Sequence, residues 1–453
     1  MRGRGHRVIG FAVFGPLALA ALVACSSAGD ATPRPTTPSA DDAGTVDGDV
    51  KAPGLDSGTS DASDGGIVEP PPYDFAVQCA GDPCVAQLAA RGGAHACAVL
   101  RDGSARCWGS NDSGQLGTGS NDGGAVAKFA TAPTRVAGLS NARSVATTGS
   151  GSAGTSCVVR ADDSLFCFGS DISGQLARET GPSTGVHADP IAVAGVRVKS
   201  ISLANTFALA SGTDGRLWSW GANDAAQLGR ILATDAGPSW LPALADRVTD
   251  GVRSFAGTSR SGFAVTTSGD VLSWGGATAD ELGRSASLSK NPVPDKLAVT
   301  GVTSVVTGAH HACALSPGRI ECWGSNDVGQ LGTGLRAEEP FPARVVLPQD
   351  VYPVAIAAGG NDTCAIDADG KLLCWGANES GQLGRLDGRD GPTPRVVQGL
   401  DEQVVAVGVM DASVCALLRS GTVRCWGDNL FGQLGRGARD ADVHPESAVV
   451  DFP

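Results

Sequence analysis

Paired cysteines are the residues whose type and spacing most clearly suggest chemistry. Of the 13 cysteines, ten form pairs nine or ten residues apart: Cys97 with Cys107, Cys157 with Cys167, Cys313 with Cys322, Cys364 with Cys374, and Cys415 with Cys425. Two segments of the same pattern lack both cysteines and carry Phe207 with Ser219 and Phe263 with Ser273. Joint presence or joint absence indicates bonded pairs, because adjacent hairpin strands bring Cα atoms to disulfide distance. We therefore predict five short disulfides of ~2 kcal/mol each.

Zinc is the alternative for paired cysteines, but zinc sites need closer Cys-x-x-Cys spacing and further ligands. The chain has only six histidines, so we expect neither a metal nor another cofactor. Cys79 and Cys84 remain unpaired downstream of Cys25, and we expect them to bond to each other. Six disulfides would require an oxidising compartment.

Two histidines, His95 and His311, lie two residues before the first cysteine of their pairs. The equivalent positions carry other hydrogen-bonding side chains: Thr155, Asn205, Ser261, Asp362 and Ser413. We interpret this position as one that satisfies backbone groups at a turn. His310 has no equivalent and is a candidate binding residue. Trp240, between Pro238 and Pro242, is a second candidate, expected to be exposed.

No catalytic constellation is recognisable in this sequence. The chain contains no His-Glu-x-x-His and no Walker-type phosphate loop. Its carboxylates are plentiful in Asn-Asp sequences, where turn chemistry accounts for them. We expect no catalytic residues and a protein that is not an enzyme.

These residues belong to a phrase that occurs seven times. Residues 108–117 read Trp-Gly-Ser-Asn-Asp-Ser-Gly-Gln-Leu-Gly, and the other copies start at Phe168, Trp220, Trp274, Trp323, Trp375 and Trp426. The starts are 60, 52, 54, 49, 52 and 51 residues apart, a period typical of repeat architectures. Each copy also holds short apolar strands, Asp-Gly or Ser-Gly hairpin turns and a Pro-x-x-Val strand. About four antiparallel strands per unit predict an all-β, seven-bladed propeller, with the tryptophans in the blade cores.

The phrase, with an upstream Gly-x-x-His and Ala-Leu, resembles the repeat of the regulator of chromosome condensation family over residues 85 to 450. The resemblance implies a seven-bladed propeller. The nucleotide exchange activity of the family's nuclear founding member is not expected, because only the framework residues match. For closure of the ring, we expect residues 444–450 to complete the first blade and so remove two exposed strand edges.

The N-terminus looks like a targeting segment. Arg2, Arg4 and Arg7 precede an apolar stretch that ends in Leu22-Val23-Ala24-Cys25, a lipobox pattern. We predict a lipoprotein signal peptide over 1–25 with Cys25 lipidated; the alternative is an ordinary secretory signal with an incidental cysteine. Residues 26–78 are rich in Pro, Ser, Asp and Gly and predict a disordered tether. The propeller is assigned to 79–453.

A net charge of -13 disfavours nucleic acid as a partner. The predicted function is a protein-interaction platform, monomeric and lipid-anchored, that binds an unidentified envelope or extracellular protein. The expected location is the bacterial outer membrane, on its periplasmic face or the cell surface. The alternatives are a polysaccharide-active envelope enzyme and a purely structural module. Partner contacts are expected in the longest insertions, 118–132 and 177–189, and where copies differ.

Overall fold

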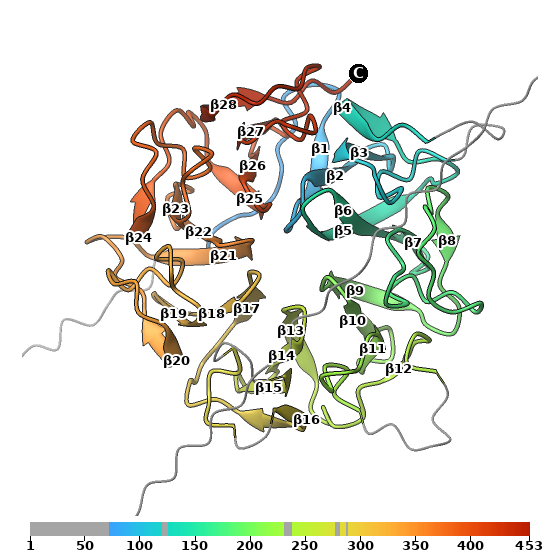
Figure 1. The fold of residues 1–453 in the computed structure, drawn as a ribbon. Coiled ribbons are helices and arrows are strands. Elements are labelled where there is room, and N and C mark those ends of the chain that lie inside the picture. Colours follow the sequence, from blue (N-terminus) through green and yellow to red (C-terminus); the bar gives the residue numbers. More distant parts are fainter. Residues whose placement is uncertain (1–71, 120–125, 231–237, 277–280, 287–288) are drawn as a thin grey trace, which may run out of the picture. The chain divides into compact units, whose positions relative to one another are not determined.

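The chain forms a ring of seven four-stranded antiparallel sheets, the blades (Figure 1). This computed structural model describes residues 72–119, 126–230, 238–276, 281–286 and 289–453. In each blade the strands follow chain order from the axis outwards, as a meander joined by hairpins. The predicted fold, an all-β propeller of seven blades with four strands each, is confirmed. Among the described residues, no helix is long and apolar enough to cross a bilayer.

Strands of equal rank occupy equivalent places in the seven blades. The innermost strands are β1 (Val85–Ala89), β5 (Ala142–Ser150), β9 (Val198–Leu203), β13 (Val252–Gly257), β17 (Ser304–Thr307), β21 (Pro353–Gly359) and β25 (Val404–Val409). The second strands are β2 (His95–Leu100), β6 (Ala153–Arg160), β10 (Phe207–Gly212), β14 (Ser261–Thr266), β18 (His311–Ser316), β22 (Asp362–Asp367) and β26 (Ser413–Leu418). The third strands are β3 (Ala105–Ser110), β7 (Leu165–Gly169), β11 (Leu217–Gly221), β15 (Val271–Gly276), β19 (Arg319–Gly324), β23 (Leu372–Gly376) and β27 (Val423–Gly427). The outermost strands are β4 (Phe129–Arg135), β8 (Ile191–Ala192), β12 (Ala243–Leu244), β16 (Lys290–Lys296), β20 (Glu339–Arg344), β24 (Gly391–Val396) and β28 (His444–Val449).

The paired cysteines face each other across the second and third strands of five blades. In blade 1, the Cα atoms of the directly opposed pair are 4.0 Å apart. The five bonds inside blades are those of Cys97 with Cys107, Cys157 with Cys167, Cys313 with Cys322, Cys364 with Cys374, and Cys415 with Cys425. The sixth predicted disulfide, Cys79 with Cys84, is also present.

The two blades without a disulfide fill the same space with apolar side chains. In blade 4, the fully buried Phe263 takes the place of the first cysteine, opposite Ser273. In blade 3 this place is held by the buried Leu209, opposite Ser219, so the predicted equivalence of Phe207 with the cysteine is wrong. Phe207 lies opposite Gly221, at the position of His95. Apolar packing therefore replaces the covalent bond there. The six disulfides elsewhere indicate folding in an oxidising compartment.

Each tryptophan of the phrase joins its blade to the preceding blade. The indoles are fully buried, and each Nε1–H donates to a backbone carbonyl in the preceding phrase. The six bonds are Trp108 to Gln433 (3.0 Å), Trp220 to Gln175 (2.9 Å), Trp274 to Gln227 (2.8 Å), Trp323 to Glu281 (2.8 Å), Trp375 to Gln330 (2.9 Å) and Trp426 to Gln382 (2.9 Å). The predicted buried position of these tryptophans is confirmed. They recur once per repeat because each one supplies a hydrogen-bond donor to one interface between blades.

The prediction that residues 444–450 complete the first blade is wrong. β28 pairs with β27 inside blade 7, and blade 1 is a complete meander that starts with its own inner strand β1. Since both end blades are complete, the ring closes without strand exchange, by side-chain packing and by backbone hydrogen bonds such as that from the N–H of Gly92 to the carbonyl of Val409 (3.0 Å). The Trp108 ring meets Phe452 edge-on, with 5.6 Å between centroids, while its N–H reaches Gln433.

The segment before β1 adds a second closing contact. The N–H of Gln78 donates to the carbonyl of Arg419 (2.6 Å), and the Tyr73 hydroxyl donates to the carbonyl of Val404 (2.9 Å). Both acceptors belong to blade 7 or its hairpin. The N-terminal segment of the propeller is therefore fastened to the last blade.

Candidate binding sites on the propeller

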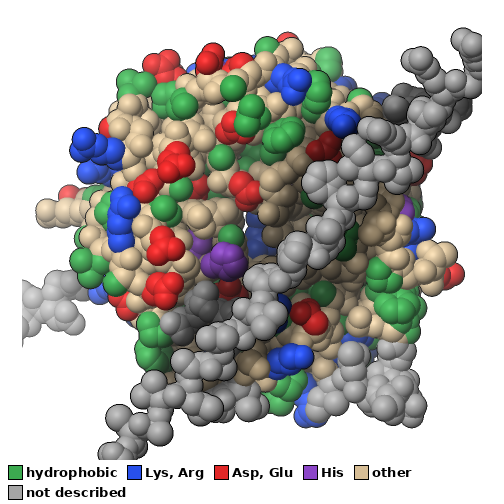
Figure 2. Space-filling model, viewed as in Figure 1, with side chains coloured by type: hydrophobic (Ala, Val, Ile, Leu, Met, Phe, Trp, Pro, Cys, Tyr) green, Lys and Arg blue, Asp and Glu red, His purple; other side chains and the backbone are tan. Residues whose placement is uncertain are grey.

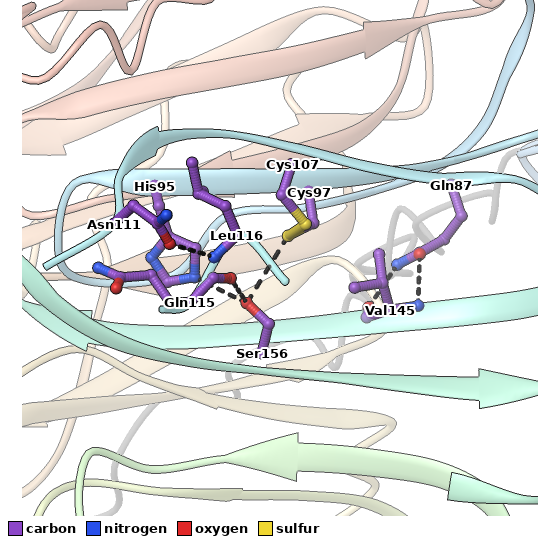
Figure 3. The surroundings of a disulfide bond; sticks show 9 residues. All are labelled: Gln87, His95, Cys97, Cys107, Asn111, Gln115, Leu116, Val145 and Ser156. Carbon is purple, nitrogen blue, oxygen red and sulfur yellow. Dashed lines mark hydrogen bonds between the residues drawn. A yellow bond between two sulfur atoms is a disulfide. The ribbon is translucent and has the colours of Figure 1, made fainter. Parts of the chain in front are cut away.

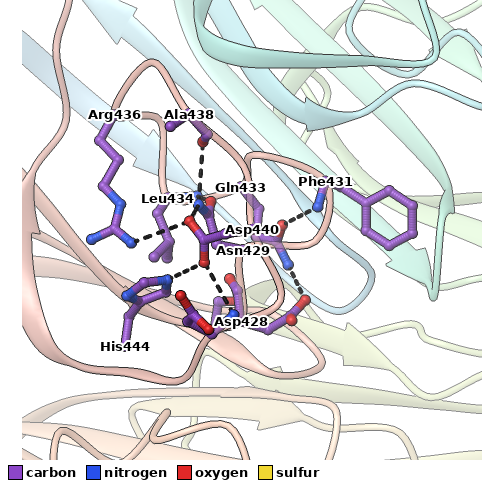
Figure 4. A network of polar contacts seen from close by, with 11 residues as sticks. Asp428, Asn429, Phe431, Gln433, Leu434, Arg436, Ala438, Asp440 and His444 are labelled. Atoms are coloured by element: carbon purple, nitrogen blue, oxygen red, sulfur yellow. Dashed lines mark hydrogen bonds and ion pairs between the residues drawn. The ribbon is translucent and has the colours of Figure 1, made fainter.

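The repeated phrase forms a rigid loop between the third and fourth strands of each blade. In blade 7, the side-chain oxygen of Asn429 accepts the N–H of Leu434 (3.3 Å), and that of Gln433 accepts the N–H of Phe431 (2.9 Å). Asp440 ties the rest of the loop to this framework, and the Phe431 ring points away from it (Figure 4). The polar residues of the phrase thus hold the loop together. Binding must come from side chains that differ between blades.

The two aligned histidines lie in the interior and contact the next blade. Nε2 of His95 is 3.0 Å from Oγ of Ser156, and Nε2 of His311 is 2.8 Å from Oγ1 of Thr363. Burial lowers the pKa of His95 to about 4 and that of His311 to about 3, so both are neutral at pH 7. Among the residues predicted to be equivalent, three donate to backbone carbonyls as expected: Thr155, Ser261 and Ser413. The prediction for Asn205 is wrong, because the position in blade 3 is held by Phe207, opposite Gly221.

Blade 2 replaces the interface tryptophan by Phe168, which has no N–H to donate. The Ser156 hydroxyl takes over this role and donates to the carbonyl of Gln115 (2.8 Å) (Figure 3). Because this hydroxyl proton is used, Ser156 accepts the Nε2–H of His95. The replacement of tryptophan by Phe168 is therefore compensated inside the interface by Ser156. It does not indicate a binding site.

Replacing Ser156 by Ala should lower the free energy of unfolding by about 1–3 kcal/mol, because the buried carbonyl of Gln115 loses its donor. Thr363→Val is the matched control in blade 6. There Trp375 still donates to the equivalent carbonyl (2.9 Å), so the loss should be smaller. Urea denaturation of both variants measures the difference. Equal losses would show that the serine does not replace the indole.

Trp240 is half-buried, and the expectation that it is exposed is wrong. Its side chain packs against Gly174 and Gly181 in the phrase loop of blade 2, so that a Cβ at Gly174 would collide with it. The same contact on other phrase glycines is made by Ala188, Thr131, Pro392 and Pro445. Trp240 is therefore an inter-blade contact.

His310 lies on the surface beside a buried carboxylate. Its Nδ1 is 2.8 Å from Oε1 of Glu281, and the side chains are 57% and 1% exposed, respectively. The second oxygen of Glu281 accepts from the hydroxyl of Thr258 (2.8 Å) and lies 3.2 Å from Oγ of Ser261, which shares its proton with the closer carbonyl of Gly276 (2.8 Å). Glu281 stands where the other phrases have Gln, so this arrangement is specific to blade 4. No three His, Cys, Asp or Glu side chains of the described residues cluster around it or elsewhere as a metal site.

Sequence reasoning missed Arg91, which follows β1 and reaches across the axis of the ring. Its guanidinium donates to the carbonyls that end three other innermost strands, those of Leu203, Gly257 (2.7 Å) and Thr307 (3.2 Å). Burial lowers the pKa of Arg91 to about 10, so it is charged at neutral pH. A signal was present: the aligned position in other copies is uncharged, as at Val409.

Arg91 divides the space at the axis. On one side is a polar recess of about 50 Å³ that includes Asn205 and Asp411, and on the other is a cavity of about 250 Å³ between the innermost strands. The space-filling view shows a hollow near the centre of the ring with acidic side chains on the surface beside it (Figure 2). Asp411 accepts the N–H of Gly151 (2.8 Å), and burial raises its pKa.

A larger groove of about 610 Å³ lies between the outer parts of blades 6 and 7. Leu386, at its edge, is 81% exposed, the highest value among the exposed large apolar side chains of the described residues. Two arginines of the groove, Arg385 and Arg424, have buried Nε atoms without an acceptor among the described residues. Burial lowers the pKa of Arg385 and Arg395 lowers it further, while Asp387 has the opposite, smaller effect. The groove therefore combines an apolar contact with two cationic groups and two carboxylates, those of Asp387 and Glu446.

Asp362 is a buried carboxyl at the position that His95 and His311 hold in their blades. Neither of its oxygens makes a hydrogen bond of good geometry in the part of the chain that is described, although the Gln382 side chain and the N–H of Ala377 lie near enough to favour its charged form. Burial raises the pKa of Asp362 well above its ordinary value, and this outweighs the opposite effect of the nearby Gln382 side chain. Alignment of the seven copies identified Asp362 as the residue equivalent to His95, but it could not show how the buried carboxyl is hydrogen-bonded.

Residues 181–185, Gly-Pro-Ser-Thr-Gly, have the spacing of a hydrolase nucleophile elbow, which the expectation of no catalytic motif overlooked. They lie in a loop where the N–H of Ser183 donates to the carbonyl of Asp171 (3.0 Å). His187 nearby is held by Arg178, with 3.2 Å between Nε2 and Nη1. The strand–turn–helix context that such an elbow needs is absent from this described loop.

The predicted lipidation site Cys25, the signal peptide and the tether up to residue 71 lie outside the described residues. Part of the insertion 118–132 does so as well. These features remain predictions.

Comparison with known families identifies the repeat. Models of the regulator of chromosome condensation (RCC1) repeat match residues 85–115, 354–382 and 405–433, and residues 102–158, 317–366 and 369–417. These matches confirm the resemblance inferred from the phrase.

Two curated relatives differ in how much of their length matches. The chain is 28% identical to the ultraviolet-B receptor UVR8 of Arabidopsis thaliana over 369 residues, 80% of this chain and 79% of that protein. It is 32% identical to the E3 ubiquitin-protein ligase HERC2 of Mus musculus over 262 residues, 56% of this chain. The match spans only 5% of HERC2.

Solved structures show the same fold. Prp20p of Saccharomyces cerevisiae superimposes with a TM-score of 0.64 and 19% identity, covering 76% of this chain and 85% of that chain. Human WBSCR16 gives a TM-score of 0.66 and 21% identity, covering 76% and 94%.

Proposed function

Since the chain is built from regulator of chromosome condensation repeats, we propose that it is an exported platform that binds a protein partner through the groove between blades 6 and 7. Propellers of this repeat type are protein-interaction platforms, which is the general part of the proposal. Prp20p, which shares the fold, is described as binding Gsp1p and histones. For this chain, the proposal adds the binding site, which is the groove, and the chemistry of the partner.

The groove carries this proposal. An apolar side chain as exposed as Leu386 is a candidate interface contact when it borders a concave surface. The side chains of Arg385 and Arg424 are half-buried in the groove, so a partner carboxylate can pair with them there, next to Asp387 and Glu446 of the groove itself. A segment of a protein with an apolar residue next to Asp or Glu therefore fits the groove.

His310 is a second contact point in the proposal. Its ring is held by Glu281 and exposed, so a partner would meet it in one orientation. Side chains that are fixed before binding cost less entropy on association.

The cellular setting in the proposal rests on Cys25 and the disulfides. Lipidated at Cys25 and connected by the tether 26–78, the propeller would act in the bacterial envelope, on the periplasmic face of the outer membrane or on the cell surface. The six disulfides support an oxidising location. Mass spectrometry of the mature N-terminus tests the lipid: an unmodified Cys25 would contradict it.

A matched pair of leucine variants tests the groove. Leu386→Asp should weaken the partner complex about tenfold, since about 1.4 kcal/mol of apolar contact is lost and a charge is placed against the partner's carboxylate. Leu335→Asp is the control, because Leu335 is 61% exposed in the corresponding loop of blade 5, away from the groove. It should change affinity less than twofold.

The partner is identified by photo-cross-linking from position 386 in envelope extracts, with a cross-linker at the exposed Asp369 as the negative control. Surface plasmon resonance then compares the two leucine variants. If both variants bind like the parent, or both lose affinity equally, the groove is not the site.

A further inference from the structure

The cavity along the axis is lined mainly by apolar residues, with three hydroxyl side chains, those of Thr147, Ser202 and Thr307. It has a volume of about 250 Å³ and is lined by all seven innermost strands, with Val145, Ile201, Phe255 and Ile356 among its apolar residues. About 10–15 Å³ is enough for one water molecule, so the cavity has room for a ligand of several heavy atoms. A site with such walls favours an alkyl chain over a polar ligand.

The apolar cavity ends at a cation. Of the described residues that line the cavity, Arg91 alone is charged. Nε and Nη2 of Arg91 donate to Thr307 and Gly257, but Nη1 has a single acceptor, the carbonyl of Leu203. One N–H of Nη1 is therefore left without an acceptor among the described residues, because each Nη carries two.

Neutral carbonyls orient the guanidinium but do not neutralise it. Burial alone accounts for the lowered pKa of Arg91, about 10, and no described carboxylate opposes that effect. The acidic residue that lines the recess beyond it, Asp411, accepts the N–H of Gly151. A carboxylate that enters from the cavity would meet an uncompensated positive charge in a poorly hydrated place, where the attraction is strong.

We propose that the axial cavity binds a short-chain alkyl carboxylate, with its chain between the innermost strands and its carboxylate paired with Arg91. This site is separate from the groove between blades 6 and 7 and does not depend on the proposed partner. Each methylene that enters the cavity should tighten binding about three- to fourfold, up to the length that fills it.

The test is calorimetric titration of the full chain with hexanoate, octanoate, octanol and octylammonium. Octanoate should bind about tenfold more tightly than hexanoate and than octanol, and octylammonium should not bind. Equal affinity for octanoate and octanol, or no binding of octanoate at millimolar concentration, would overturn the proposal.

Two variants locate the site. Arg91→Met should reduce the affinity for octanoate about tenfold, to that for octanol, while octanol binding is retained. Ala146→Leu adds bulk to a half-buried position of the cavity wall and should weaken both ligands. Near-UV circular dichroism reports whether each variant is folded. If Arg91→Met is not folded, Ala146→Leu decides: unchanged octanoate affinity in that variant would place the ligand elsewhere and refute the proposal.

Discussion

Replacing Trp108 by Ala should lower the free energy of unfolding by about 3–5 kcal/mol, because a fully buried indole leaves a cavity at the interface that closes the ring. Trp108→Phe separates the hydrogen bond from the packing. It should cost about 1–3 kcal/mol, since the buried carbonyl of Gln433 loses its donor at 3.0 Å. Thermal and urea denaturation measure both losses.

Blade 2 shows how the phenylalanine variant can be rescued. There Phe168 coexists with Ser156, whose hydroxyl serves the carbonyl that an indole serves elsewhere. The equivalent residue in blade 1 is Ala96, so Ala96→Ser should recover most of the loss in Trp108→Phe. It should not recover the loss in Trp108→Ala, where the cavity remains. A serine that rescues neither variant would contradict this account of the interface.

Replacing Asp362 by Ser should raise the free energy of unfolding at pH 7 by about 1–3 kcal/mol. The carboxyl is fully buried without a hydrogen bond of good geometry among the described residues, whereas Ser413, at the same position in blade 7, donates to the carbonyl of Asp428 (2.8 Å). A serine at 362 can make the equivalent bond. The reverse change, Ser413→Asp, is the matched control and should destabilise blade 7 by a similar amount.

The effect of Asp362 must depend on pH in one direction. Its pKa is raised on folding, so the folded state holds the proton more tightly than the unfolded chain. The carboxyl therefore contributes its stability below the ordinary Asp pKa of about 3.9 and loses it as the pH rises through the raised pKa. The gain from Asp362→Ser should be small at pH 4 and grow towards pH 7. A gain that is constant over this range would exclude a buried, titrating carboxyl.

Features that depend on one blade and its neighbour could be predicted from the sequence. Cys97 and Cys107 are ten residues apart because a hairpin turn sets them opposite each other. Trp108 recurs because six of the seven interfaces between blades use an indole donor, which makes the period visible in the chain. The fold class, the number of blades and the disulfides follow from such local constraints.

Contacts that join distant blades could not be predicted in this way. Arg91 is one cation in the sequence, and its acceptors come from blades 3, 4 and 5, which only the closed ring brings to one point. Trp240 was expected to be exposed because its flanking prolines suggest a loop, yet the adjoining phrase loop covers it. Likewise, β28 could have paired with either end blade, and the choice depended on which sheet had a free edge.

The amino-acid sequence alone thus specifies a disulfide-bonded propeller of seven blades, since strand pairing and turns act between residues that are close along the chain. The place where an apolar cavity meets an unpaired cation, the closure of the ring and the groove between blades depend instead on the folded ring. Those properties arise from the convergence of all seven blades on one axis, and no single repeat encodes that arrangement.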